Sequence, residues 1–416
     1  MCENLNAEIA SGTIGSVVEA VGYLSWTFFA RRMKTNPSYY GADSGSDEDV
    51  DMALLAVVRD SLSKLSKSGC IEYDERDTTT GIIVPSPLGH ASCNYYLLHE
   101  TPKQMQFGVR ECRKVVLAEL EIGGHEKPKE LSSATSMAFD RSKRVDELSL
   151  AWLLYTLCHT HEFDELPVRH NEASLNEELS KNVVWGPDTQ KFLSGKATYH
   201  GPDLFADPHT KAFLLVQASM ERVRFPISDY VNDAKSVVEN VPRLLAAMEY
   251  IAAADMTAAG SFELLTQFAR SRQYIESKSL PGGNPLSQIG LPAQVAESLM
   301  QGASGKKNAV RDIARLRSLP RKEFRALLNK LGQKNRLNGI ETVLDRLYSI
   351  PVFTVQEAKV VSEVNKTTGK SSGRLKVVVN LERTGGKKQY RTDSDSSLES
   401  KGTTDFVAAR GDRKVQ

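Results

Sequence analysis

The spacing of apolar residues is the feature that most constrains the fold of this 416-residue chain. Through most of the chain up to residue 349, apolar side chains recur at every third or fourth position, as they do on one face of an α-helix. The longest such stretch covers residues 233–254. Only after Pro351 does the alternation typical of a β-strand appear, at residues 373–381, with residues 352–361 as the expected partner strand. The sequence therefore predicts a mainly α fold with a short β segment near its end.

A proline interrupts the longest helical stretch. Pro242 removes a backbone donor and clashes with the preceding turn, which costs about 3 kcal/mol inside a helix. We therefore expect the helix over residues 233–254 to be kinked at Pro242 or to begin there.

The first hundred residues predict a winged-helix module. Ser16 and Glu19 have the spacing of a capping box, so a helix is expected to begin there and to end at Asn36-Pro37. A second helical stripe follows, and then two short strands near residues 70–73 and 81–84 flank a polar turn. Helices followed by a small hairpin are the pattern of a winged helix.

Trp26, Phe28 and Phe29 raise a question of their own, because Arg31 and Arg32 follow them directly. The helical spacing favours a core helix that is buried on two sides and has a basic C-terminal end, where cations interact favourably with the helix dipole. Direct contact with nucleic acid is the alternative interpretation.

Composition and charge exclude several classes of protein. A net charge of +1 creates no overall field for nucleic acid or membrane, so any basic surface has to be local. The five cysteines contain no CxxC pair, which argues against a zinc site and a disulfide framework. No apolar run is long enough for a bilayer and no signal peptide is visible, so we expect no membrane association and a cytoplasmic or nuclear location.

The predicted organisation has six parts. They are a winged-helix-like module (1–102), a charged insertion with partial disorder (103–146), a helical bundle (147–280), a helix-hairpin-helix region (281–350), a truncated immunoglobulin-like β-sandwich segment (351–383) and a disordered tail (384–416).

Several long strings resemble one known family. They are LNAEI at residue 5, YLSWTFF with NPSYY from residue 23 to 40, LPVRHNE at residues 166–172 and DPHTK at residues 207–211. Together they resemble the Sec63 homology unit that follows the ATPase domains of Ski2-like DExH helicases, over about residues 4–383. The strings LPVRHNE and DPHTKA look closer to the helicase subunit of the activating signal cointegrator complex than to the spliceosomal helicase that unwinds the U4/U6 duplex.

The sequence also departs from that family. It contains no Walker A motif and no DExH box, and the family's β-sandwich is longer than the 65 residues after Pro351. The resemblance therefore implies a C-terminal fragment or a split gene product, with no catalytic residue, no metal site and no cofactor. The GASGKK string at residue 302 lacks the spacing of a phosphate loop. His159, His161 and His170 lie near acidic residues, but packing at helix ends explains them better than a metal does.

Candidate nucleic-acid contacts come from two places. Twelve cations and only four acidic residues fall between Lys306 and Arg346, which is typical of a phosphate-binding surface, although a solvated helix face is equally consistent. The resemblance places this region at the family's helix-hairpin-helix position, and it places Arg243 on the helix that tracks single-stranded nucleic acid. The candidate residues are Arg243, Lys306, Lys307, Arg311, Arg315 and Arg317.

Three functions remain open at this point. The first is a non-catalytic helicase accessory unit that binds single-stranded RNA or DNA and contacts helicase ATPase domains or other subunits of a helicase complex. The second is a protein-interaction scaffold without affinity for nucleic acid. The third is a translocon subunit at the endoplasmic reticulum, which would need membrane spans and a J domain.

Overall fold

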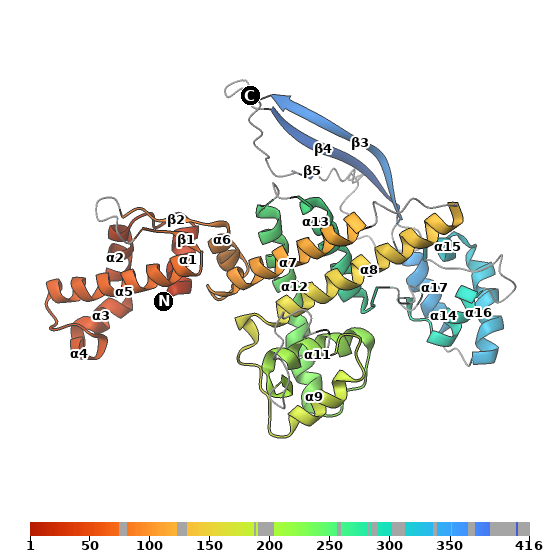
Figure 1. The fold of residues 1–416 in the computed structure, drawn as a ribbon, viewed down its shortest axis with the longest axis horizontal. Helices are drawn as coiled ribbons and strands as arrows, with labels where there is room; N and C mark the ends of the chain where they lie inside the picture. The colour runs from red at the N-terminus through yellow and green to blue at the C-terminus, as the bar shows by residue number, and fades with distance from the viewer. Residues whose placement is uncertain are drawn as a thin grey trace, which may run out of the picture. The chain divides into compact units, whose positions relative to one another are not determined.

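A computed structural model describes the chain at residues 1–74, 81–122, 131–186, 189, 204–255, 259–281, 283, 286, 289–301, 313–335, 339–350, 352–364, 371–382 and 405–406. It divides into two compact units, Met1–Pro281 and Gly282–Gln416, each of which is described by itself (Figure 1). Helices form most of the first unit, which confirms the mainly α prediction. No helix in the described part of the chain has the length and apolarity that crossing a bilayer requires.

The first unit begins with the predicted winged-helix module. Ser16 accepts a hydrogen bond from the backbone N–H of Glu19 at 3.3 Å, and Glu19 accepts one from Gly15 N at 2.7 Å, so the predicted cap is confirmed. The two short strands pair antiparallel, with Ile71 opposite Pro85. The elements are α1 (Cys2–Ala10), α2 (Val17–Ser25), α3 (Phe28–Thr35), α4 (Pro37–Tyr40), α5 (Asp47–Lys67), β1 (Ile71–Glu72), β2 (Val84–Pro85) and α6 (Pro87–Asn94).

The expectation of one continuous helix from residue 17 to residue 35 is wrong. Helix α2 ends at Ser25, Trp26 is its C-cap, and α3 starts at Phe28. Thr27 stabilises the break, because its hydroxyl donates to the carbonyl of Leu24 at 2.6 Å. The break turns α3 so that Ala30 and Met33 face the core of the module.

The helical bundle forms the rest of the first unit. Helices α7 and α8 lie side by side, and α12 packs against α7, α8 and α11 (Figure 1). Its elements are α7 (Thr101–Ile122), α8 (Leu131–Cys158), the 3-10 turn η1 (His161–Phe163), α9 (Glu172–Ser180), the 3-10 turn η2 (Leu204–Ala206), α11 (Pro208–Glu221), α12 (Ser228–Ala254) and α13 (Ser261–Ser277).

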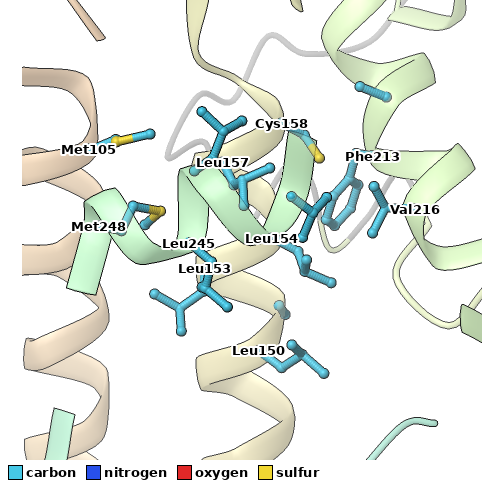
Figure 2. Packing of buried hydrophobic residues seen from close by; sticks show 14 of the residues in the cluster. Met105, Leu150, Leu153, Leu154, Leu157, Cys158, Phe213, Val216, Leu245 and Met248 are labelled. Carbon is cyan, nitrogen blue, oxygen red and sulfur yellow. The ribbon is translucent and has the colours of Figure 1, made fainter. Parts of the chain in front are cut away.

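One hydrophobic core joins these helices. Leu150, Leu154 and Leu157 of α8 belong to this core, in which Leu154 lies beside Phe213 of α11 and Met248 of α12 lies near Met105 of α7 (Figure 2). All six side chains are fully buried. Burying a side chain of this size contributes about 1.5–3 kcal/mol, so this cluster provides much of the stability of the unit.

Two further expectations differ from the structure. The charged insertion predicted at 103–146 is helical over most of its length, since α7 and α8 cover it except at 123–130, which lies outside the described residues. Helix α12 continues through Pro242, so of the two predicted alternatives the one in which a helix begins there is wrong, and a kink at Pro242 stays a prediction. Val241 and Leu244 beside the proline are fully buried, and packing of this face stabilises the helix despite the missing hydrogen bond.

The second unit contains four helices and a sheet among its described residues. Phe324 and Leu328 of α16 are buried with Leu344 of α17. Strands β3 and β4 pair antiparallel with a bulge between Val355 and Glu357, which confirms the two predicted strands. The elements are α14 (Ala293–Gln301), α15 (Ile313–Ser318), α16 (Arg321–Asn335), α17 (Ile340–Ser349), β3 (Val352–Val364), β4 (Ser371–Glu382) and β5 (Asp405–Phe406). The predicted disordered tail lies outside the described residues, except that β5 pairs with β4.

Candidate nucleic-acid interface

Trp26, Phe28 and Tyr39 lie on the surface of the winged-helix module. Their exposed fractions are 91%, 71% and 81%, so the expectation that Trp26 and Phe28 belong to the core is wrong. Arg31 and Arg32 are exposed on α3, the short helix that begins at Phe28. We call these five residues the aromatic surface. Large aromatic side chains lose favourable burial when they face water, so these residues are candidates for contact with a partner.

The local fold explains why these side chains point outward. Helix α3 has eight residues, and its inner face is occupied by Ala30 and Met33. Phe29 packs partly against the core and meets Tyr40 edge to face, with ring centroids 5.5 Å apart. Phe29 thus fills the position against the core, and its neighbour Phe28 faces solvent.

The charges of the aromatic surface are available to an anion. Lys34 pairs with Asp47, whereas no carboxylate of the described residues forms a salt bridge with Arg31 or Arg32. The guanidinium carbon of Arg32 lies 5.9 Å from the centre of the Phe28 ring, within cation–π range. Aromatic faces and arginines in this arrangement can stack on nucleic-acid bases and neutralise phosphates.

Arg243 of α12, a predicted contact residue, is held by the protein itself. Its Nη1 donates to the carbonyls of Tyr95 and Tyr96, both at 2.8 Å. Its Nη2 donates to Asn240 at 2.8 Å and lies 3.3 Å from the carboxylate of Glu162. The side chain is 31% exposed. Arg243 thus ties α12 to the end of α6, and whether it also touches nucleic acid stays a prediction.

The basic segment can be followed only in part. Lys306, Lys307 and Arg311 lie outside the described residues, as does the side chain of Arg315. Arg317 is half-buried at the end of α15. In the following helix, Arg321 pairs with Asp345 at 2.6 Å and Arg325 pairs with Glu341 at 2.7 Å. Some of the positive charge of this segment is therefore neutralised within the unit.

The strings LPVRHNE and DPHTK meet in a buried ion cluster. Lys211 Nζ contacts Glu172 at 2.6 Å and the carbonyl of Pro167 at 2.7 Å. Arg169 pairs with Glu172 at 2.9 Å and with Asp233 at 2.7 Å. Burial raises the pKa of both carboxyl groups, but the hydrogen bonds from Lys211 and Arg169 outweigh it, and each pKa lies below its ordinary value. The cluster joins three helices, α9, α11 and α12, so these strings serve the fold.

His159, His161 and His209 form contacts with protein groups. His161 Nδ1 lies 2.9 Å from Asp164, and His209 Nε2 lies 3.1 Å from the same carboxylate. His159 stacks on Tyr155 with ring centroids 3.9 Å apart, and burial lowers its pKa to about 4. Within the described part of the chain, no group of three such residues is arranged to hold a metal ion.

The fold defines a modular, mainly helical protein in which a winged helix with an exposed aromatic surface precedes a helical bundle. Residues 1–75 match a family described as a winged helix-turn-helix domain, and residues 130–411 match the Sec63 Brl domain. The chain belongs to the Sec63 Brl domain family. Neither of these domains is a helicase ATPase domain.

Similar proteins include several large helicases. The chain is 33% identical over 246 residues to the DExH-box ATP-dependent RNA helicase DExH14 of Arabidopsis thaliana, covering 59% of this chain and 9% of that protein. It is 34% identical over 253 residues to the human activating signal cointegrator 1 complex subunit 3, covering 61% of this chain and 9% of that protein. It is 33% identical over 250 residues to the RQC trigger complex helicase SLH1 of Saccharomyces cerevisiae, covering 59% of this chain and 10% of that protein. The matched regions span about a tenth of the length of these relatives. The predicted resemblance to the Sec63 homology unit of Ski2-like helicases is confirmed.

Proposed function

We propose that this chain is a non-catalytic accessory unit of a nucleic-acid helicase, and that it binds single-stranded RNA or DNA. Its relatives include helicases, and its own matched domains contain no ATPase. ATP hydrolysis would then come from helicase ATPase domains or other subunits of the complex. We place this activity in the cytoplasm or nucleus, as expected for such a complex.

The aromatic surface is the observation that carries the proposal. Trp26 and Phe28 offer ring faces to bases, and stacking of this kind contributes about 1–3 kcal/mol per base. Arg31 and Arg32 provide charge for the phosphates between those bases. Such contacts tolerate any sequence, because every base has a flat face.

The test is a binding titration of the full chain with fluorescein-labelled oligo-uridine and oligo-thymidine at several salt concentrations. We expect affinity to fall steeply with salt because phosphate contacts release counterions. Trp26→Ala and Phe28→Ala should each lower the affinity about 5- to 150-fold. The double variant Arg31→Gln/Arg32→Gln should bind more weakly and with a shallower salt dependence.

Two matched controls separate this surface from general effects. Phe262→Ala removes a ring that is 74% exposed on α13, and Lys181→Gln/Lys235→Gln removes two exposed charges, one from the C-cap of α9 and one from α12. Both controls should bind like the wild-type chain. Equal losses in the controls would show a nonspecific charge or surface effect and would contradict the proposal.

The basic segment provides a second, independent set of contacts. Replacing Arg311, Arg315 and Arg317 together with glutamine should weaken binding and reduce its salt dependence, since each phosphate contact contributes to the slope. Lys306, Lys307 and Arg243 are the remaining candidates of this kind.

A protein-interaction scaffold is the second candidate function, because the same exposed rings could bind another protein. A wild-type chain that binds neither oligonucleotide at low salt would favour this function. The purified chain should also hydrolyse no ATP, with or without nucleic acid, and turnover in a phosphate-release assay would contradict an accessory role.

A further inference from the structure

Tyr96 occupies an unusual backbone position just after α6. Tyr95 is the C-cap of this helix, and Tyr96 follows with a φ of +52°. The N–H of Tyr96 donates to Cys93 O at 3.4 Å, and the N–H of Leu97 donates to Ser92 O at 2.9 Å. These two bonds are the Schellman arrangement, which ends a helix with one residue in the left-handed region.

Glycine is the usual residue at this position, because a Cβ atom makes the left-handed conformation unfavourable. The tyrosine ring does not compensate by packing, since Tyr96 is 85% exposed. The hydrophobic contact that accompanies this turn comes from Leu97, which is 3% exposed. A glycine would therefore serve the fold at least as well, and the Tyr96 ring requires another reason.

The turn that carries Tyr96 is held firmly from two sides. Arg243 donates to the carbonyls of both Tyr95 and Tyr96, at 2.8 Å each. Glu162 accepts a hydrogen bond from Leu98 N at 2.9 Å and also pairs with Arg243. The ring thus projects into solvent from a fixed backbone, so binding a ligand would order little beyond the side chain itself.

We propose that Tyr96 is a base-stacking residue for single-stranded nucleic acid and that Arg243 is the residue that positions it. This inference rests on the function proposed above and adds a contact outside the aromatic surface. An exposed ring on a fixed backbone suits stacking on a base. It also gives the predicted residue Arg243 a defined role, since its donors already hold the turn.

Two substitutions with equal backbone strain isolate the ring. Tyr96→Phe and Tyr96→Leu both keep a Cβ in the left-handed region, but only phenylalanine can stack. In titrations of the full chain with fluorescein-labelled oligo-uridine, we expect Tyr96→Phe to bind like the wild-type chain. Tyr96→Leu should bind about 5- to 150-fold more weakly, the loss that one stacked base represents.

Tyr96→Gly tests whether the ring has a structural role. It relieves the strain, so its melting temperature should equal or exceed that of the wild-type chain, while its affinity should fall as in Tyr96→Leu. A structural role would lower the melting temperature and affinity together and would contradict the proposal. Phe262→Ala is the matched control and should leave the affinity unchanged.

The remaining outcomes are also decisive. If Tyr96→Leu and Tyr96→Phe bind equally well while Trp26→Ala weakens binding, the inference on Tyr96 is overturned and the proposed function stands. If the wild-type chain binds no oligonucleotide, the proposed function and this inference both fail.

Discussion

The ammonium group of Lys211 lies 2.7 Å from the carboxylate of Asp233, and the lysine side chain is completely buried. Its three donors are used by Asp233, Glu172 and the carbonyl of Pro167. The ammonium also lies 4.8 Å from the ring centre of Tyr230. A buried charge is tolerated only when it is paired in this complete way, so each member of the cluster depends on the others.

Lys211→Met should therefore destabilise the fold strongly. The change leaves Glu172 and Asp233 buried with only Arg169 to balance them, and removing one partner of a buried pair costs about 3–5 kcal/mol. Urea unfolding followed by circular dichroism measures the loss. Lys235→Met, on the exposed face of α12, is the control and should stay within about 0.5 kcal/mol of the wild-type chain. An equally small effect for Lys211→Met would contradict the role of the cluster.

His159 should make stability depend on pH. Burial lowers its pKa to about 4, from an ordinary value of 6.5. At a pH between these two values, His159 is protonated in the unfolded chain and neutral in the folded chain. Stability therefore falls as the pH decreases through this range. The slope is at most about 1.4 kcal/mol per pH unit.

Urea unfolding at about pH 7 and about pH 5 measures this dependence. His159→Phe cannot take up the proton, so its stability should change less between the two pH values than that of the wild-type chain. Equal slopes for both proteins would show that another group is responsible.

Trp26→Ala should leave stability almost unchanged. The side chain is 91% exposed, and surface changes usually stay within about 0.5 kcal/mol. Phe213→Ala, in the core of the bundle, should cost about 3–5 kcal/mol in the same thermal or urea unfolding measurement. A loss of that size for Trp26→Ala would place the indole in the core after all.

Periodicity predicted the helices well and their exposed faces less well. The second helical stripe predicted for the winged-helix module is the buried face of α5, with Leu54, Val58 and Leu62, because nothing interrupts that helix. No proline or glycine marks the break after Ser25. The helical spacing of apolar residues in α2 therefore continues into α3 without interruption. The local bond of the Thr27 hydroxyl to the carbonyl of Leu24 and the packing of Phe29 against the core decide the change of direction, and apolar spacing reveals neither.

Charge composition predicted a partly disordered segment at residues 103–146, where the structure has helices for a reason that lies elsewhere in the chain. Arg113 is 8% exposed and pairs with Asp255 at 2.9 Å, and Asp146 pairs with Arg270 at 2.7 Å. Partners that lie more than a hundred residues away cannot be recognised from local composition. The same holds for Tyr96, whose exposure and left-handed backbone conformation arise only in the folded chain.

Arg243 offers the sharpest test of a structural role against a direct binding role. If its main task is to hold the turn at Tyr95 and Tyr96, Arg243→Met should lower stability by about 1.5–3 kcal/mol, the value of hydrogen bonds to a charged group. The loss should shrink in a chain that already carries Glu162→Gln, because the two side chains form one network. Urea unfolding of the four proteins in this cycle measures the coupling. A contact made only with nucleic acid would instead leave the stability of Arg243→Met unchanged and lower the affinity for oligo-uridine alone.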